Sequence, residues 1–278
     1  MEDSNKALEQ CLQESEMSIS ERLDPSPKHD AGHYVDLPLV RNEKTLEIAD
    51  GETFEKVYVL GGDTQALTEL PFANVIVGAG AKVNIVVVIM PGTSIDLPLA
   101  VDIVGEGADV NVSGLYLCGR DEKVGIRTEV RHRVPSCTSN QLFNGIAAGH
   151  AVVRFYGKIV VAPDAQKTEA YQTNHNLVVS DGAKAEAKPQ LEIYADDVKC
   201  SHGATVGQLN EDEQFYMRSR GIPEDEARVL QMISFMAPVL ANITDETQRE
   251  EIGSAVESAV RKSLFSKPEC LRYFGNNI

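Results

Sequence analysis

Short apolar runs separated by glycine-bearing turns fill residues 34–206 and limit the folds open to this chain. The clearest strand-like runs are residues 83–90, 101–117 and 152–163, and no helical period is sustained for ten residues in this region. Because glycine adopts positive φ freely, it is favoured at tight corners between strands. The pattern therefore predicts a mainly β core over residues 34–206.

The spacing of these corners favours a repeating fold. Glycines at 51, 80, 107, 149 and 182 each lie between strand-like runs, in steps of 29, 27, 42 and 33 residues. Near-equal blocks are typical of a solenoid, in which each coil buries its apolar face against the next. A β-sandwich also has frequent strands and turns, and the irregular steps leave it open on spacing alone.

Charge and motifs exclude several classes of function. The 278 residues carry a net charge of −16, whereas a nucleic-acid surface needs gathered basic residues, so we expect no nucleic-acid partner. The glycine clusters VGAGAKV and VGEGADV match neither dinucleotide-binding nor P-loop patterns. We therefore expect this chain to bind no nucleotide.

Cysteine usage and hydropathy indicate a reducing compartment. The five cysteines include no Cys-x-x-Cys pair, so neither a disulfide framework nor a zinc ribbon is indicated. No stretch approaches the roughly 18 apolar residues that a membrane span requires, and the acidic start MEDSNKALEQ lacks the apolar segment of a signal peptide. These features predict a cytoplasmic protein without a membrane partner.

The chain divides into three parts by composition. Residues 1–33 form an acidic tail in which Leu8 and Leu12 lie at helical spacing, so this tail is either a short helix followed by a linker or disordered. Residues 34–206 form the β core, and residues 207–278 form a helical region. Asn210 is expected to cap the first helix of that region and Pro223 to begin the second, with Ala227, Leu230, Ile233 or Ser234, and Ala237 as its buried stripe and Pro238 as its kink or end. A third helix is expected near Thr244 and should end at Lys267 and Pro268.

One stretch, residues 189–221, joins sheet, metal-binding residue types and helix. It contains Cys200 and His202, and side chains two apart on a strand project to the same face. A thiol and an imidazole are thus presented together. Packing of both side chains within a sheet is the alternative interpretation of this pattern.

The run YADDVKCSHGATVGQL, followed by FYMRSRGI, resembles the SufB/SufD family of iron-sulfur cluster assembly scaffolds, and its SufD branch in particular. The resemblance extends upstream through SNQLF, GKI, AQKT and AYQTN and covers residues 127–240. It implies a right-handed parallel β-helix followed by a small C-terminal α-helical region.

The resemblance also implies a site shared between two subunits. His202 is the best candidate ligand for iron or a transient iron-sulfur cluster and Cys200 the second, because thiolates suit such clusters and imidazole can replace a thiolate on iron. The SufB branch has a carboxylate on each side of this histidine and a thiol near the position of Asn174. Ser201 and Gly203 flank the histidine here, so the chain is expected to be a SufD-like partner that completes a site.

The partners that the resemblance implies are a SufC-type ABC ATPase, bound through the C-terminal helices, and a SufB-like subunit or a second copy, bound through the β-helix. The resulting hypothesis is a scaffold without catalytic residues. The alternative is a β-solenoid interaction or structural module that has lost the cluster-assembly role. A β-helix enzyme would need clustered carboxylates on one face, and Asp196 and Asp197 are adjacent in sequence.

Overall fold

A computed structural model of the chain describes residues 39, 41–62, 67–92 and 94–264. The chain divides into two compact units, 1–35 and 36–278, and every described residue belongs to the second. The predictions for the tail 1–33, for Cys11 and Cys270, and for the end of the last helix at Lys267 and Pro268 lie outside the described residues.

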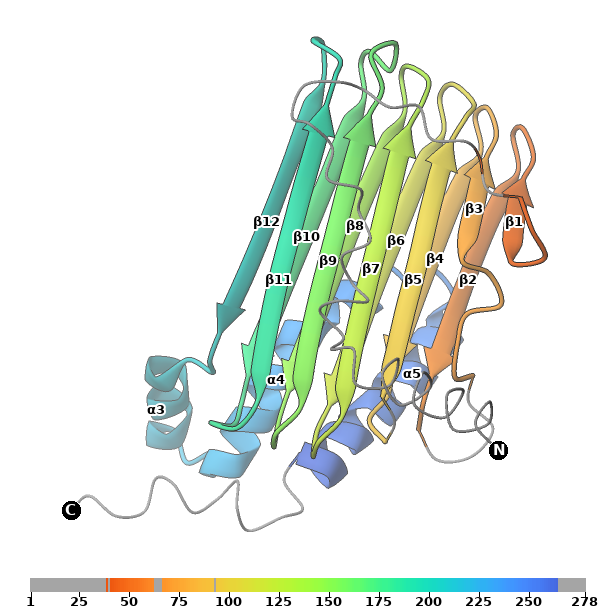
Figure 1. Ribbon diagram of the computed structural model, residues 1–278. Helices are drawn as coiled ribbons and strands as arrows, with labels where there is room; N and C mark the ends of the chain where they lie inside the picture. Colours follow the sequence, from red (N-terminus) through yellow and green to blue (C-terminus); the bar gives the residue numbers. More distant parts are fainter. Residues whose placement is uncertain (1–38, 40, 63–66, 93, 265–278) are drawn as a thin grey trace, which may run out of the picture. The chain divides into compact units, whose positions relative to one another are not determined.

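Twelve strands form two parallel six-stranded sheets, shown in Figure 1 as two stacked layers. Neighbours within a sheet are two strands apart in sequence, so the chain alternates between the sheets and adds one strand to each per coil. This winding is a parallel β-solenoid, which confirms the predicted fold class. The first sheet, in spatial order, contains β1 (Thr45–Ile48), β3 (Asn74–Val77), β5 (Ile95–Ile103), β7 (Lys123–His132), β9 (Val152–Val161) and β11 (Lys184–Ile193). The second contains β12 (Lys199–Gly207), β10 (Glu169–Val178), β8 (Thr138–Ala147), β6 (Asp109–Cys118), β4 (Lys82–Ile89) and β2 (Thr53–Leu60).

The turns form two series, one at each edge of the solenoid. Turns from the first sheet to the second contain residues with positive φ every 27 to 31 positions: Gly51, Gly80, Gly107, Ser136 and Lys167. The glycines at 149 and 182 belong to the opposite series, which leads from the second sheet back to the first. The irregular step of 42 residues, from Gly107 to Gly149, therefore compared turns at opposite edges of the solenoid.

The solenoid interior changes in character along the stack. Side chains of the early coils that face inward are apolar, such as Val83, Ile85 and Val87 on β4. In the later coils, polar side chains enter the same interior, and Asn174 and Asn176 are hydrogen-bonded to each other and to the hydroxyl of Tyr116. The buried polar interior therefore lies toward the β11–β12 end.

Three helices follow the solenoid: α3 (Glu211–Ser219), α4 (Glu224–Leu240) and α5 (Glu246–Ala259), which continues as a π-helical turn, η1 (Val260–Leu264). Helices α4 and α5 pack on the outer face of the second sheet, behind the strands in Figure 1. The contact buries Val229, Met232 and Met236 of α4 against strand residues such as Val88 and Leu115.

The expected helix starts are close to those observed, but the expected buried stripe of α4 is only partly correct. Asn210 caps α3 by accepting from the backbone N–H groups of residues 212 and 213. In α4, Ala227 is buried as predicted, whereas Leu230 is exposed. The sheet selects the helix face that carries Val229, Met232 and Met236, and the helix continues two residues beyond Pro238.

Candidate functional site

The candidate site lies at the β11–β12 end of the solenoid. Strand β11 pairs with β9 and β12 pairs with β10, and within the described residues neither has a strand on its other side. The run from residue 189 to residue 207 therefore contains the end of one strand, a connection at residues 194–198 and the whole of a second strand in the other sheet. The predicted site residues are on this second, terminal strand.

Cys200 and His202 occupy neighbouring positions on the inward face of β12. They are in register with Ala170 and Gln172 of β10, whose side chains are buried in the interior. The thiol is half-buried and the imidazole is exposed, because no further coil covers them in the described part of the chain. Ser201 lies between them and faces the opposite way.

Burial raises the pKa of the Cys200 thiol, and a backbone hydrogen bond from Ala170 opposes that shift. A raised pKa keeps the sulfur protonated to a higher pH, so a metal ion must displace the proton to bind the thiolate. A neutral imidazole binds a metal without that competition once one ring nitrogen is unprotonated. Metal binding by Cys200 would therefore release a proton.

The two side chains alone cannot enclose a metal ion. Over the described residues there is no group of three or more His, Cys, Asp or Glu side chains placed to hold one. Asn174 is fully buried and donates to Tyr116 and to the carbonyl of Phe143. The described residues therefore supply no third ligand beside the pair.

Apolar side chains surround the pair at this end of the stack. Ile193 of β11 is 41% exposed and Val206 of β12 is 51% exposed, although both follow columns of inward-facing residues. Ala187 and Leu191 lie on the same inward face of β11 and are half-buried. Exposed apolar groups at an unpaired strand edge are typical of a surface that another strand or protein covers.

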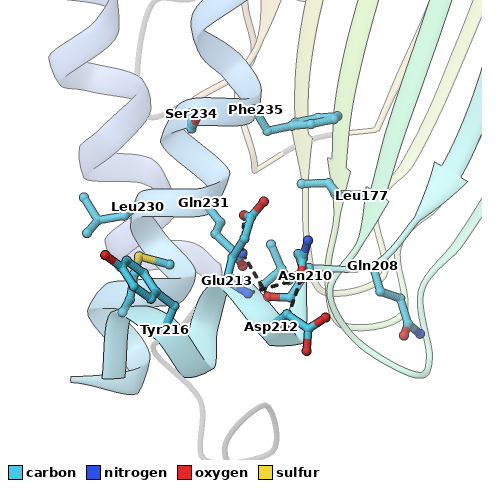
Figure 2. Close-up of a pocket in the computed structure, with 12 residues that line it drawn as sticks. Leu177, Gln208, Asn210, Asp212, Glu213, Tyr216, Leu230, Gln231, Ser234 and Phe235 are labelled. Atoms are coloured by element: carbon cyan, nitrogen blue, oxygen red, sulfur yellow. Dashed lines mark hydrogen bonds between the residues drawn. The ribbon is translucent and has the colours of Figure 1, made fainter. Parts of the chain in front are cut away.

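A second feature is an open groove of about 700 Å³ between the last coil, α3 and α4. Figure 2 shows Leu177, Tyr216, Leu230 and Phe235 around it, with Asn210, Glu213 and Gln231 joined by hydrogen bonds at one side. The Gln231 amide donates to the Asn210 carbonyl at 3.0 Å and to the Glu213 carboxylate at 2.8 Å. These bonds tie α3 to α4 through polar contacts.

Helix α3 is an exposed helix with aromatic side chains on its surface. None of its residues is buried, Phe215 is 73% exposed and Tyr216 is 59% exposed. The guanidinium of Arg220 lies 5.3 Å from the Tyr216 ring centroid, a cation–π arrangement. Large exposed aromatic groups beside a groove commonly mark protein-interaction surfaces.

The other arginine, histidine and cysteine side chains that could take part in chemistry are held by contacts within the fold. Arg131 and Arg133 both form ion pairs with Asp102, a buried carboxylate that the sequence did not single out. The side chain of His132 faces the interior and shares a 2.8 Å hydrogen bond with Ser139. The thiols of the buried Cys118 and Cys137 donate to backbone carbonyls. None of the described helices is long and apolar enough to span a membrane.

Comparisons with known proteins agree with this architecture. Residues 55–235 match the family described as SUF system FeS cluster assembly, SufBD core domain. The chain is 41% identical to the iron-sulfur cluster assembly protein SufD of Escherichia coli over 133 residues, which cover 48% of this chain and 31% of that protein. A SufBD family protein of Synechocystis is 47% identical over 109 residues, covering 39% of this chain and 24% of its own length. The SufD of Bacillus subtilis is 33% identical over 132 residues, which cover 48% of this chain and 28% of its length.

Proposed function

The chain belongs to the SufBD family of SUF-system iron-sulfur cluster assembly proteins, and from this premise we propose that it is a SufD-like scaffold subunit without catalytic residues of its own. The observation that carries the proposal is the position of His202 and Cys200, side by side on the last coil at an unpaired strand edge. Such a pair supplies half of a ligand set for a transient cluster or iron, which is the cargo of the assembly.

The proposed second half comes from a SufB-like subunit or from a second copy of this chain. The unpaired edges of β11 and β12 and the exposed Ile193 and Val206 support association through this end. Replacing Val206 with Glu should weaken that association, because it places a charge in a surface that becomes dry. Sedimentation of the chain alone and mixed with a SufB-like subunit distinguishes the two assemblies, and unchanged association in Val206→Glu would exclude this end as the interface.

Cluster assembly is tested by anaerobic reconstitution with iron and sulfide, with the partner subunit present. His202→Ala and Cys200→Ala should each reduce the visible absorption of the cluster, with the larger loss for His202. Ser201→Ala is the matched control, because its side chain leaves the same strand on the opposite face. Equal cluster absorption in all three variants would remove the pair from the site and leave the chain as a β-solenoid interaction module.

We also propose that the groove between α3 and α4 binds a SufC-type ABC ATPase. The exposed Phe215 and Tyr216 and the groove beside them support this assignment. Removing residues 207–278 would uncover the apolar outer face of the second sheet, so point variants are the cleaner test. Phe215→Ser combined with Tyr216→Ser should abolish co-purification with the ATPase, whereas Leu67→Ser, an exposed apolar residue before β3, should leave it intact. Retained co-purification in the double variant would reject the groove.

The proposal places this assembly in the reducing cytoplasm. Thiols such as that of Cys200 would stay reduced in that compartment, where disulfides do not persist.

A further inference from the structure

Directly behind His202, the interior holds an amide side chain without a partner. Gln172 of β10 is in register with His202, its side chain faces the same interior, and it is 1% exposed. Neither its Nε2 nor its Oε1 has a hydrogen-bond partner in the described part of the chain. A buried amide left unpaired costs about 1–3 kcal/mol, so such a group calls for a specific explanation.

The local packing is built around this amide. Gly157 of β9 faces Gln172 across the interior, and a Cβ added at Gly157 would lie 2.4 to 2.6 Å from three atoms of the amide group. The missing side chain at Gly157 therefore creates the space that the Gln172 side chain fills. The next coil places Pro189 beyond Gly157 and His202 beyond Gln172, so the imidazole is the next polar side chain along this column.

The column also offers the Gln172 amide a hydrogen-bond partner on its other side. On the other side of Gln172, the Gln141 Oε1 accepts a 2.7 Å hydrogen bond from the hydroxyl of Thr128. A carbonyl oxygen has two lone pairs, so the same Oε1 has capacity for the Nε2–H of Gln172. As placed, the Gln172 amide bonds to neither Gln141 nor His202, and the Gln141 Nε2 is also without a partner among the described residues. A rotation of the Gln172 side chain that brings its Nε2 to the Gln141 Oε1 leaves its own Oε1 for His202.

We propose that Gln172 is the positioning residue for His202, its Oε1 accepting the ring N–H of the imidazole and leaving the other ring nitrogen free to bind iron. Strands in a sheet lie about 4.8 Å apart, which a glutamine side chain spans. A histidine that binds a metal commonly donates its second ring nitrogen to a neighbouring acceptor, which fixes the tautomer and the ring orientation. The inference rests on the proposed function only for the role of iron, because the hydrogen bond is a property of this chain alone.

The test is NMR of the full chain with ¹⁵N-labelled histidine. A hydrogen-bonded ring proton exchanges slowly with water and is observed, so wild-type protein should give such a signal, assigned by its loss in His202→Ala. Gln172→Met keeps the side-chain volume but removes the acceptor and should abolish the signal, and Gln172→Glu should restore it. His132, whose ring is buried against Ser139, gives an internal reference in every sample.

Ser201→Ala, whose side chain leaves β12 on the opposite face, is the matched control, and the His202 ring signal should survive in it. Gln141→Met removes the oxygen that would hold the Gln172 Nε2, so it should weaken the signal without abolishing it. No protected His202 proton in wild-type protein, or an undiminished one in Gln172→Met, would overturn the inference.

Iron binding separates this inference from the proposed function. With Fe²⁺ under anaerobic conditions and the partner subunit present, Gln172→Met should weaken affinity about 10- to 100-fold, as the loss of an orienting partner commonly does. Equal iron affinity in Gln172→Met and wild type rejects a positioning role. If the ring-proton results are as expected but His202→Ala reconstitutes clusters as wild type does, the hydrogen bond stands and the cluster role of His202 fails.

Discussion

The interior histidine His132 should make this protein less stable in mild acid. Burial lowers the pKa of its imidazole from the ordinary value of 6.5 to about 4. Between these values the unfolded chain binds a proton that the folded chain does not, so the free energy of unfolding falls as pH decreases. The contribution is fully present above pH 6.5 and is lost progressively down to about pH 4.

The size of the effect follows from the two pKa values. Each pKa unit corresponds to about 1.4 kcal/mol, so His132 should account for about 3 kcal/mol of lost stability across this window. A change of that size is a large fraction of the 5–15 kcal/mol that is typical of folded domains. Protonation should therefore be visible as a lower urea midpoint in mild acid.

The assay is urea unfolding at about pH 7.5 and about pH 4.5, which bracket most of this window. Carboxylates also titrate in this range, so the informative quantity is the difference between wild type and His132→Gln, a variant that does not take up the proton. His175→Gln is the control, because His175 lies on the outer face and pairs with Thr205. If wild type and His132→Gln lose equal stability between the two pH values, burial does not keep the His132 ring neutral and the reasoning is wrong.

Three further substitutions test the packing. Tyr116→Phe removes two buried hydrogen bonds and leaves the Oδ1 of Asn176 without a donor. Urea unfolding should show that the free energy of unfolding falls by about 2–3 kcal/mol, and a fall of less than about 1 kcal/mol would contradict this network. Gly105→Ala puts a Cβ onto the backbone nitrogen of Ala79, and we expect a loss of about 3 kcal/mol in thermal unfolding; wild-type stability would refute that close approach. Met236→Ala empties a buried position between α4 and the sheet and should cost about 2–5 kcal/mol, with faster hydrogen exchange in α4 as the readout and unchanged exchange as the contrary result.

The repeat of the solenoid was only partly readable from the sequence, for a conformational reason. Glycine marks the corners at 51, 80 and 107, but the next two corners in that series carry Ser136 and Lys167, which adopt positive φ themselves. A search for glycine therefore misses the last two turns of this series and continues instead with turns at the opposite edge of the solenoid. The regular period of 27 to 31 residues emerges only when the backbone is known.

The faces of the C-terminal helices depend on what the helices pack against. Helix α4 carries apolar residues on more than one side, and its own sequence does not determine which side becomes buried. The apolar outer face of the second sheet, at Val86, Val88 and Leu117, selects the Met232 and Met236 side. Leu230 is exposed beside the groove, although its helical spacing predicted that it would be buried.

The strand-face argument for Cys200 and His202 was confirmed because alternation along a strand is a local property. What the sequence did not indicate is the column behind them. Gln141, Gln172 and His202 are about 30 residues apart along the chain, near the coil period, and adjoin in space only because the coils stack in register.

The geometry of a solenoid explains why the candidate ligands are on its last coil. Every inward-facing column is covered by the following coil, so a polar side chain within the stack must be satisfied there, as Asn174 and Asn176 are. At β12, the last strand of its sheet among the described residues, the same column presents His202 to the outside with an in-register strand behind it. An imidazole in this position is held by the fold yet open to a second surface, which under the proposed function would complete its ligand set. Regulation of cluster exposure would then need no rearrangement of the solenoid, only a change at its terminal interface.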